Sequence, residues 1–148
     1  MNKIINLSLI ALLLLGSTII NSCKKDKNLA VLTTTAVSAV TISSGNSGGS
    51  ITDGGGADIT ARGVCWSTTT NPTISGGDTT LNDKGTGSFI SHITDLDPNT
   101  KYYVKAYATN SVGTAYGLEV NFTTNAIVVP IVTTVEVASP GLTSATSG

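Results

Sequence analysis

The chain has 148 residues, of which only 11% are charged and 5% are aromatic, and its formal net charge is −1 at neutral pH. A chain with so little positive charge lacks the basic surface that binding to DNA or RNA requires, so no nucleic-acid partner is expected. After the first 30 residues no stretch shows the 3.6-residue apolar period of a helix, whereas short apolar runs alternate with glycine-containing turns. The composition therefore favours an all-β protein.

Residues 1–22 have the pattern of a secretory signal peptide, which is expected to be helical. Lys3 supplies a positive charge, and the 17 residues from Ile4 to Ile20 are almost wholly apolar. This order of charge, apolar run and cleavage region is typical of exported proteins. The run of 17 residues is at the lower limit of the length that spans a bilayer, so an uncleaved membrane anchor is one alternative to a lipoprotein signal. An ordinary secretory signal is the other.

The end of this segment, Ile20-Asn21-Ser22-Cys23, resembles a bacterial lipobox. The resemblance implies that Cys23 becomes the first residue of the mature protein and carries a diacylglycerol through a thioether, with further acylation. Several acyl chains together hold a protein firmly to a membrane where one would not. The partner expected from this motif is therefore the membrane, through the lipid on Cys23.

Residues 23–30 contain three lysines and one aspartate, so a solvated tether is expected there. The tether resembles the export tags of some Gram-negative surface lipoproteins, which implies a location in the cell envelope at the outer membrane, with its outer face as a candidate. Lipidation of Cys23 leaves Cys65 without an intramolecular disulfide partner. Cys65 is expected to be a small buried or half-buried residue rather than a reactive thiol.

An internal repeat links the start of the mature chain to its end. Residues 31–37 (VLTTTAV) align with residues 131–137 (IVTTVEV) at an offset of 100. The matched positions are Thr33, Thr34 and Val37 with Thr133, Thr134 and Val137. A period this long indicates tandem domains rather than a solenoid. Residues 126–148 are therefore interpreted as a linker and the start of a truncated second repeat, which is expected to be poorly ordered without partner strands.

Turn residues divide residues 31–125 into short strands. The strands are expected at 31–40, 47–52, 59–67, 86–94, 101–110 and 115–124, and one of the turns at Gly45 to Gly49. About seven short strands at this spacing predict an Ig-like β-sandwich. The expected core members outside the 101–110 run are Ile59, Val64, Trp66, Phe89, Ser91, Ile93, Leu96, Leu118, Val120 and Phe122.

Alternation in the 101–110 run assigns its two faces. Tyr102, Val104, Ala106 and Ala108 form the apolar face, whereas Lys101, Tyr103, Lys105 and Tyr107 form the charged face. Tyr103 and Tyr107 are thus candidates for a small exposed contact surface for a polysaccharide or a protein. The alternative is ordinary cross-strand packing on a solvent-facing sheet.

Residues 96–110 (LDPNTKYYVKAYATN) resemble the sixth strand and its lead-in of a fibronectin type III domain, and residues 113–124 resemble the last strand. The positions Leu96, Pro98, Thr100 and Tyr102 match that family's tyrosine corner. The resemblance implies a β-sandwich over roughly residues 30–125, in which Tyr102 buries its ring and its hydroxyl bonds to the backbone upstream. It leaves the order of the first three strands open.

Catalytic chemistry finds little support in the sequence. Residues 45–49 (GNSGG) formally match G-x-S-x-G, but no helix is predicted after them and the single histidine, His92, lies on a predicted strand. The aspartates sit in turns without the ligand order of a calcium loop, and there is no cysteine–histidine cluster. We therefore expect no catalytic residue, no metal and no cofactor.

Together these features predict a non-catalytic, lipid-anchored surface module that acts as a spacer or an adhesion repeat. Two alternatives remain from the sequence. The repeats are accessory to a larger envelope enzyme, such as a glycan hydrolase or a protease, or the module itself binds carbohydrate. Modules of this type project other domains from a surface, and this expectation rests on the family resemblance alone.

Overall fold

The computed structural model describes residues 26–136, and these residues form eight β-strands and no helix. The all-β prediction is therefore confirmed. Among the described residues there is no helix with the length and apolar character to cross a membrane. The signal peptide, the lipidation site Cys23 and most of the second repeat lie outside the described residues.

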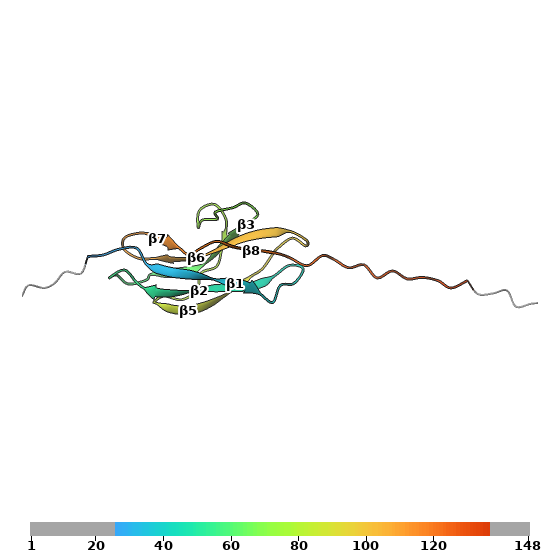
Figure 1. The fold of residues 1–148 in the computed structure, drawn as a ribbon, viewed down its shortest axis with the longest axis horizontal. Helices are drawn as coiled ribbons and strands as arrows, with labels where there is room; N and C mark the ends of the chain where they lie inside the picture. The colour runs from blue at the N-terminus through green and yellow to red at the C-terminus, as the bar shows by residue number, and fades with distance from the viewer. Residues whose placement is uncertain (1–25, 137–148) are drawn as a thin grey trace, which may run out of the picture.

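The strands form two antiparallel sheets that pack face to face (Figure 1). The first sheet has the order β1-β2-β5, with β1 at Val31–Ser38, β2 at Gly45–Asp53 and β5 at Gly87–Ile93. The second has the order β4-β3-β6, with β4 at Asp78–Thr79, β3 at Ala61–Ser67 and β6 at Lys101–Thr109. The far edge of β6 pairs with both β7 (Thr114–Tyr116) and β8 (Val120–Thr123). This arrangement is an Ig-like, fibronectin type III-like sandwich.

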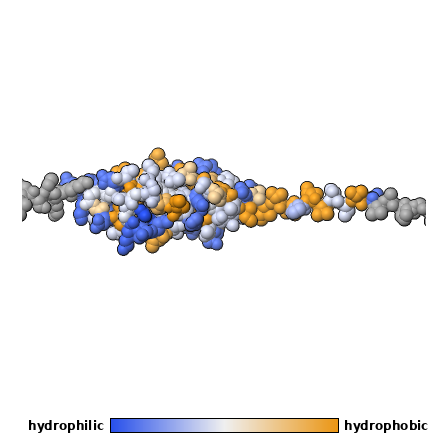
Figure 2. Space-filling view, turned by 90° about the horizontal axis from the view of Figure 1, so that it is seen from below, coloured by the Kyte–Doolittle hydropathy of each residue, from blue (hydrophilic) through white to orange (hydrophobic). Residues whose placement is uncertain are grey.

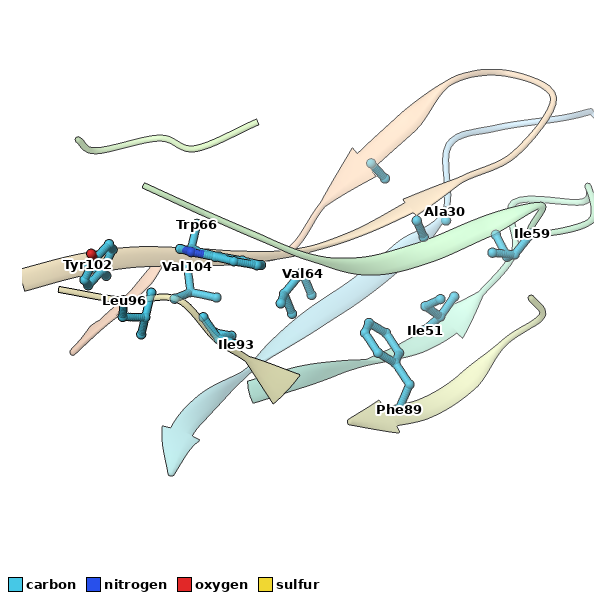
Figure 3. Packing of buried hydrophobic residues seen from close by; sticks show 13 residues of the cluster. Ala30, Ile51, Ile59, Val64, Trp66, Phe89, Ile93, Leu96, Tyr102 and Val104 are labelled. Atoms are coloured by element: carbon cyan, nitrogen blue, oxygen red, sulfur yellow. The ribbon is translucent and has the colours of Figure 1, made fainter. Parts of the chain in front are cut away.

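The core lies between the sheets and follows the expected alternation (Figure 3). Every second residue of β6 is buried, and Val104, Ala106 and Ala108 have no exposed surface. The opposite sheet contributes Phe89 and Ile93. The remaining buried members of this cluster are Ala30, Ile51, Ile59, Val64, Trp66, Leu96, Tyr102 and Ala115. Contiguous burial of this kind is the main stabilising contribution to a small sandwich.

The expected turn at Gly45 to Gly49 is wrong, because these residues open strand β2. Glycine suggests a turn from sequence, but here it serves close approach between backbones. A Cβ on Gly49 would lie 2.6 Å from the Thr33 carbonyl oxygen and 2.8 Å from the Cβ of Ala106. A side chain at this position would therefore push the neighbouring strand or the opposite sheet away.

The expected strand 115–124 is interrupted, and Leu118, predicted to point inward, is 85% exposed. At the interruption the first sheet contacts the second directly. The Thr34 hydroxyl accepts a hydrogen bond of 3.0 Å from the backbone N–H of Ala106, while the Gly117 N–H donates to the Ala106 carbonyl over 2.9 Å. Thr34 thus replaces one bond of the sheet ladder, and the chain turns Leu118 to solvent before β8 begins.

The chain enters the sandwich at one end and leaves it at the opposite end (Figure 1). On the entry side the Asn28 N–H donates to the Gly55 carbonyl over 2.7 Å, and the Asn110 side chain donates to the Asn28 carbonyl over 2.7 Å. On the exit side Asn125 donates to the carbonyls of Thr41 and Val40. Residues 126–136 follow as an exposed segment that forms no strand.

Candidate functional site

The corner before β6 is held by a hydrogen-bonded cluster around Tyr102. The Asp97 N–H donates to the Tyr102 hydroxyl over 3.0 Å, and the ring of Tyr102, which is only 7% exposed, stacks on Phe122 with 5.9 Å between centroids. Thr124 donates to the Asp97 carbonyl over 2.6 Å and accepts from the Thr100 N–H over 2.9 Å. The corner therefore joins the start of β6 to the point where the chain leaves the domain.

The other corner positions support this turn. Leu96 is buried and its N–H donates to the Ser43 carbonyl over 3.1 Å, which attaches the corner to the first sheet. Pro98 is half-buried, and its carbonyl accepts a 3.0 Å bond from the Thr100 hydroxyl. These four residues are brought together by the fold, and their contacts are structural.

The expected aromatic contact surface requires a correction at Tyr107. Tyr103 is half-buried on the outer face of β6, but Tyr107 is only 5% exposed. Its hydroxyl donates a 2.7 Å hydrogen bond to the Thr80 carbonyl. The segment around Thr80 runs beside β3, with the Thr80 N–H bonded to the Val64 carbonyl over 2.9 Å. Alternation predicts the face of a residue but not the loop that covers that face, which is why the exposure of Tyr107 was predicted wrongly.

Tyr116, which the sequence patterns did not single out, is the aromatic neighbour on this face. It lies opposite Tyr107 in the register of β6 and β7, and its hydroxyl accepts from the Ile74 N–H over 3.2 Å. The ammonium groups of Lys101 and Lys105 lie 5.2 Å and 4.9 Å from the ring centroids of Tyr103 and Tyr116. Only the strand register brings Tyr116 here, so no local sequence signal marks it. Because lysine side chains lie over both rings, neither is a bare stacking platform for a sugar.

A shallow acidic groove lies at the open edge of the sandwich beside Trp66. Trp66, Asp78 and Asp95 line two adjoining hollows of about 320 and 470 Å³. His92 borders the first hollow, Asp97 the second, and no lysine or arginine lines either. Within residues 26–136 no group of three histidine, cysteine or acidic side chains is arranged to hold a metal ion. The groove therefore offers carboxylate acceptors to hydroxyl-bearing or cationic ligands. Its tryptophan, Trp66, is only 7% exposed, so little of the aromatic ring is accessible to a ligand.

The serine and the histidine considered for nucleophilic chemistry lie on opposite faces of the first sheet. Ser47 is 3% exposed and its hydroxyl donates to the Thr35 carbonyl over 2.8 Å. His92 is exposed, and its Nδ1 lies 2.7 Å from the Asn46 side-chain oxygen. A nucleophile must lie within hydrogen-bonding reach of its base in an accessible site, and this pair does not.

Cys65 is fully buried and its thiol contacts the Lys105 carbonyl oxygen at 3.5 Å. Burial raises the pKa of the Cys65 thiol to about 11, although the positive charge of Lys105 acts in the opposite direction. A thiol with this pKa is almost wholly protonated at neutral pH and is a poor nucleophile. The burial of Cys65 agrees with the sequence prediction.

Comparison with known proteins locates the fold. No protein-family model and no curated protein sequence matches the chain. Among solved structures it is similar to the fourth FNIII domain of a human protein, at 18% identity and a TM-score of 0.52, covering 78% of this chain and 93% of that one. It is also similar to the sensor domain of the anti-sigma factor RsgI4 of Pseudobacteroides cellulosolvens, at 17% identity and a TM-score of 0.50, covering 69% of this chain and 100% of that one.

The described part of the chain is thus a fibronectin type III-like domain. At identities below a fifth, this likeness concerns the fold and not the ligand.

Proposed function

We propose that the chain is a non-catalytic surface module, anchored by lipid on Cys23, that acts as a spacer or adhesion unit in the cell envelope. The supporting observation is that the chain enters the sandwich near Asn28 and leaves it near Asn125, at opposite ends of the domain (Figure 1). A domain that is entered at one end and left at the other adds its whole length to the distance between the membrane and whatever follows. Residues 131–137, which repeat the first strand, begin soon after the exit.

Fixed entry and exit points make such a module an effective spacer. Asn28 is bonded to two loops at the entry side, and Asn125 is bonded to the turn after β1 at the exit side. These bonds fix the backbone where the described chain enters the domain and where it leaves it. Spacing is preferred over sugar binding on β6, because Tyr107 is buried and lysine side chains lie over the Tyr103 and Tyr116 rings.

The anchor is tested by comparing Cys23→Ser with the native chain expressed in a Gram-negative host. The native chain is expected in the membrane fraction, with a mass increased by the acyl groups and with residues 1–22 removed. Cys23→Ser is expected to lose this mass and to leave the membrane fraction. Cys65→Ala is the matched control, since it removes the other cysteine and should keep the lipid. A Cys23→Ser protein that stays in the membrane with the native mass would refute the anchor.

The spacer role is tested separately by measuring accessibility at the cell surface. An epitope placed after Asn125 should be accessible to an antibody on intact cells when residues 31–125 are present. Deleting residues 31–125 while keeping residues 1–30 should reduce antibody binding several-fold at equal protein amounts. Equal binding by both proteins would show that the domain does not act as a spacer.

A further inference from the structure

The acidic groove contains a hydrogen-bond donor that the protein leaves unpartnered. Trp66 is only 7% exposed, yet its indole N–H donates to no protein acceptor among residues 26–136, although buried tryptophans usually find one. The only fully buried side-chain nitrogen or oxygen without a partner in this part of the chain is Nε of Arg62. The Trp66 N–H is therefore not sealed in the core, and it reaches solvent through the hollows that Trp66 lines. Figure 3 shows Trp66 at the end of the core near Tyr102, which also lines the second hollow.

Two carboxylates with free acceptor positions stand beside this donor. Asp78 of β4 lies directly opposite Trp66 of β3, and residues opposite each other in an antiparallel pair project to the same face with their Cβ atoms about 5 Å apart. Asp95 follows β5 and lines both hollows together with Asp78. Within the described residues no group donates to the Asp78 carboxylate, and Asp95 accepts only from the adjacent Thr94 hydroxyl, over 2.8 Å. Both carboxylates therefore keep lone pairs available for a ligand.

The two sides of the groove are held by the core of the sandwich. Asp95 lies between the buried residues Ile93 and Leu96, and the Leu96 N–H is bonded to the Ser43 carbonyl over 3.1 Å. Asp78 is held by the pairing of β4 with β3. The donor and the two acceptors thus come from both sheets and are placed before any ligand arrives, which lowers the entropic cost of binding.

This set of groups selects a ligand that carries hydroxyls. Asp97 adds a third carboxylate and no lysine or arginine lines either hollow, so an anion is repelled. A cation can bind the carboxylates, but it has no acceptor for the Trp66 N–H. A hydroxyl both donates and accepts, and a sugar ring carries several of them side by side. The hollows of about 320 and 470 Å³ also lie in the range of small-ligand sites, which is about 300 to 1,000 Å³.

We propose that the acidic groove binds a neutral sugar residue of a glycan, whose hydroxyls donate to Asp78 and Asp95 while one of them accepts from the Trp66 indole N–H. Recognition is through hydrogen bonds at the edge of the indole, so the buried ring does not have to stack on the sugar. None of residues 126–136 lines either hollow, so the site is built by the sandwich alone. The proposal goes beyond the spacer role and does not depend on the lipid anchor, so each can fail without the other.

NMR titration of the chain of residues 24–148 tests the proposal, and this chain keeps the whole sandwich because its core cluster lies between Ala30 and Phe122. Trp66 is the single tryptophan, so its indole N–H gives one signal in a proton–nitrogen spectrum. The probes are the methyl glycosides of glucose, galactose, mannose and N-acetylglucosamine, each added up to about 100 mM. At least one is expected to shift the indole signal in a saturable way, with a Kd on the order of millimolar. An indole signal that none of these glycosides moves would overturn the proposal.

Asp95→Asn and Asp78→Asn test the two acceptors without changing the shape of the groove. Asp95 has a φ of 60°, a backbone conformation that asparagine also tolerates, so this variant should fold. A hydrogen bond to a neutral amide is about half as strong as one to a carboxylate, so each variant is expected to raise the Kd for the glycoside about ten-fold. Asp58→Asn is the matched control, because it removes the same charge from an exposed aspartate that lines a different hollow. It should leave the Kd unchanged.

Three results would contradict a sugar site in this groove. Equal Kd values for Asp58→Asn, Asp78→Asn and Asp95→Asn would show that these carboxylates make no specific contact. If spermidine or calcium chloride shifts the indole signal and the glycosides do not, the groove is a cation site. If a glycoside shifts the amide signals of Tyr103 and Tyr116 and leaves the indole signal in place, the sugar binds the outer face of β6 instead.

Discussion

The phenol of Tyr107 donates a hydrogen bond of 2.7 Å to the carbonyl of Thr80, two residues that are 27 positions apart in the chain. The bond fixes the segment after β4 across the outer face of β6. The same segment is attached to β3 by the Asn82 N–H, which donates to the Arg62 carbonyl over 2.8 Å. The outer face of the second sheet is therefore partly covered, and a side chain that alternation assigns to solvent becomes a structural one.

Replacing Tyr107 by phenylalanine is expected to lower the free energy of unfolding by about 1 kcal/mol, because the carbonyl of the half-buried Thr80 loses its partner while the ring remains. Urea denaturation followed by the fluorescence of Trp66, the single tryptophan, measures the change. Tyr103→Phe is the control, since Tyr103 is a half-buried residue whose hydroxyl has no protein partner among the described residues, and its effect should stay within about 0.5 kcal/mol. Equal losses for both variants would mean that the Tyr107 bond contributes nothing.

Tyr102→Phe is expected to destabilise the domain by about 1 kcal/mol through the loss of the acceptor for the Asp97 N–H. Because this bond closes the corner locally, the Asp97 amide should also exchange its hydrogen faster than in the native protein under conditions where most of the sandwich stays folded. Amide exchange measured by NMR resolves this residue. Unchanged protection of Asp97 would show that the corner is held without the phenol.

Gly49→Ala is expected to destabilise the domain by about 2 kcal/mol or more, because the added methyl group meets both the Thr33 carbonyl and the Ala106 side chain. Gly76→Ala is the matched control: it adds the same group in a loop, where the nearest atom is the Thr73 hydroxyl at 3.3 Å. Thermal unfolding of the two variants should differ by several degrees in Tm. A Gly49→Ala variant as stable as Gly76→Ala would contradict the close approach of strands seen here.

The sequence predicts the parts of this fold that depend on local pattern. Alternation in β6 identifies Tyr102, Val104, Ala106 and Ala108 as buried, because the side chains of a strand point to opposite faces in turn. The motif around Pro98 likewise identifies the corner before any contact is known. Both signals lie within a few residues of each other, where sequence patterns are informative.

The features that the sequence did not predict depend on contacts between distant segments. In the sequence Gly49 indicates a turn. In the structure it is a strand residue that lies close to the Thr33 backbone and to Ala106. In the sequence Leu118 continues an alternating pattern. In the structure Thr34 interrupts the hydrogen-bond ladder beside Gly117, and the alternation ends there. The acidic groove likewise combines Asp78 of β4 with Asp95, which lies after β5, and only the packing of the two sheets brings these carboxylates together.

The stability of the domain should fall at alkaline pH because of Cys65. Its pKa is about 11 in the folded state against 9.0 for an unperturbed thiol, and desolvation by burial is the main cause. Between these values the unfolded chain loses the thiol proton while the folded chain keeps it. The folded state then holds more protons, so the free energy of unfolding decreases as pH rises from about 9 to about 11, by at most about 1.4 kcal/mol per pH unit.

Urea midpoints of the native domain and of Cys65→Ala, measured at about pH 7.5, 9 and 10.5, check this expectation. The first value lies below the range in which the thiol titrates, and the other two lie at its start and within it. The native domain should lose stability between the last two values, and Cys65→Ala should lose less. The pKa of Tyr107 is also raised by burial, so its titration adds a further decrease at higher pH that Tyr107→Phe removes. If the native domain and Cys65→Ala show the same pH dependence, the buried thiol is not the group that titrates on unfolding.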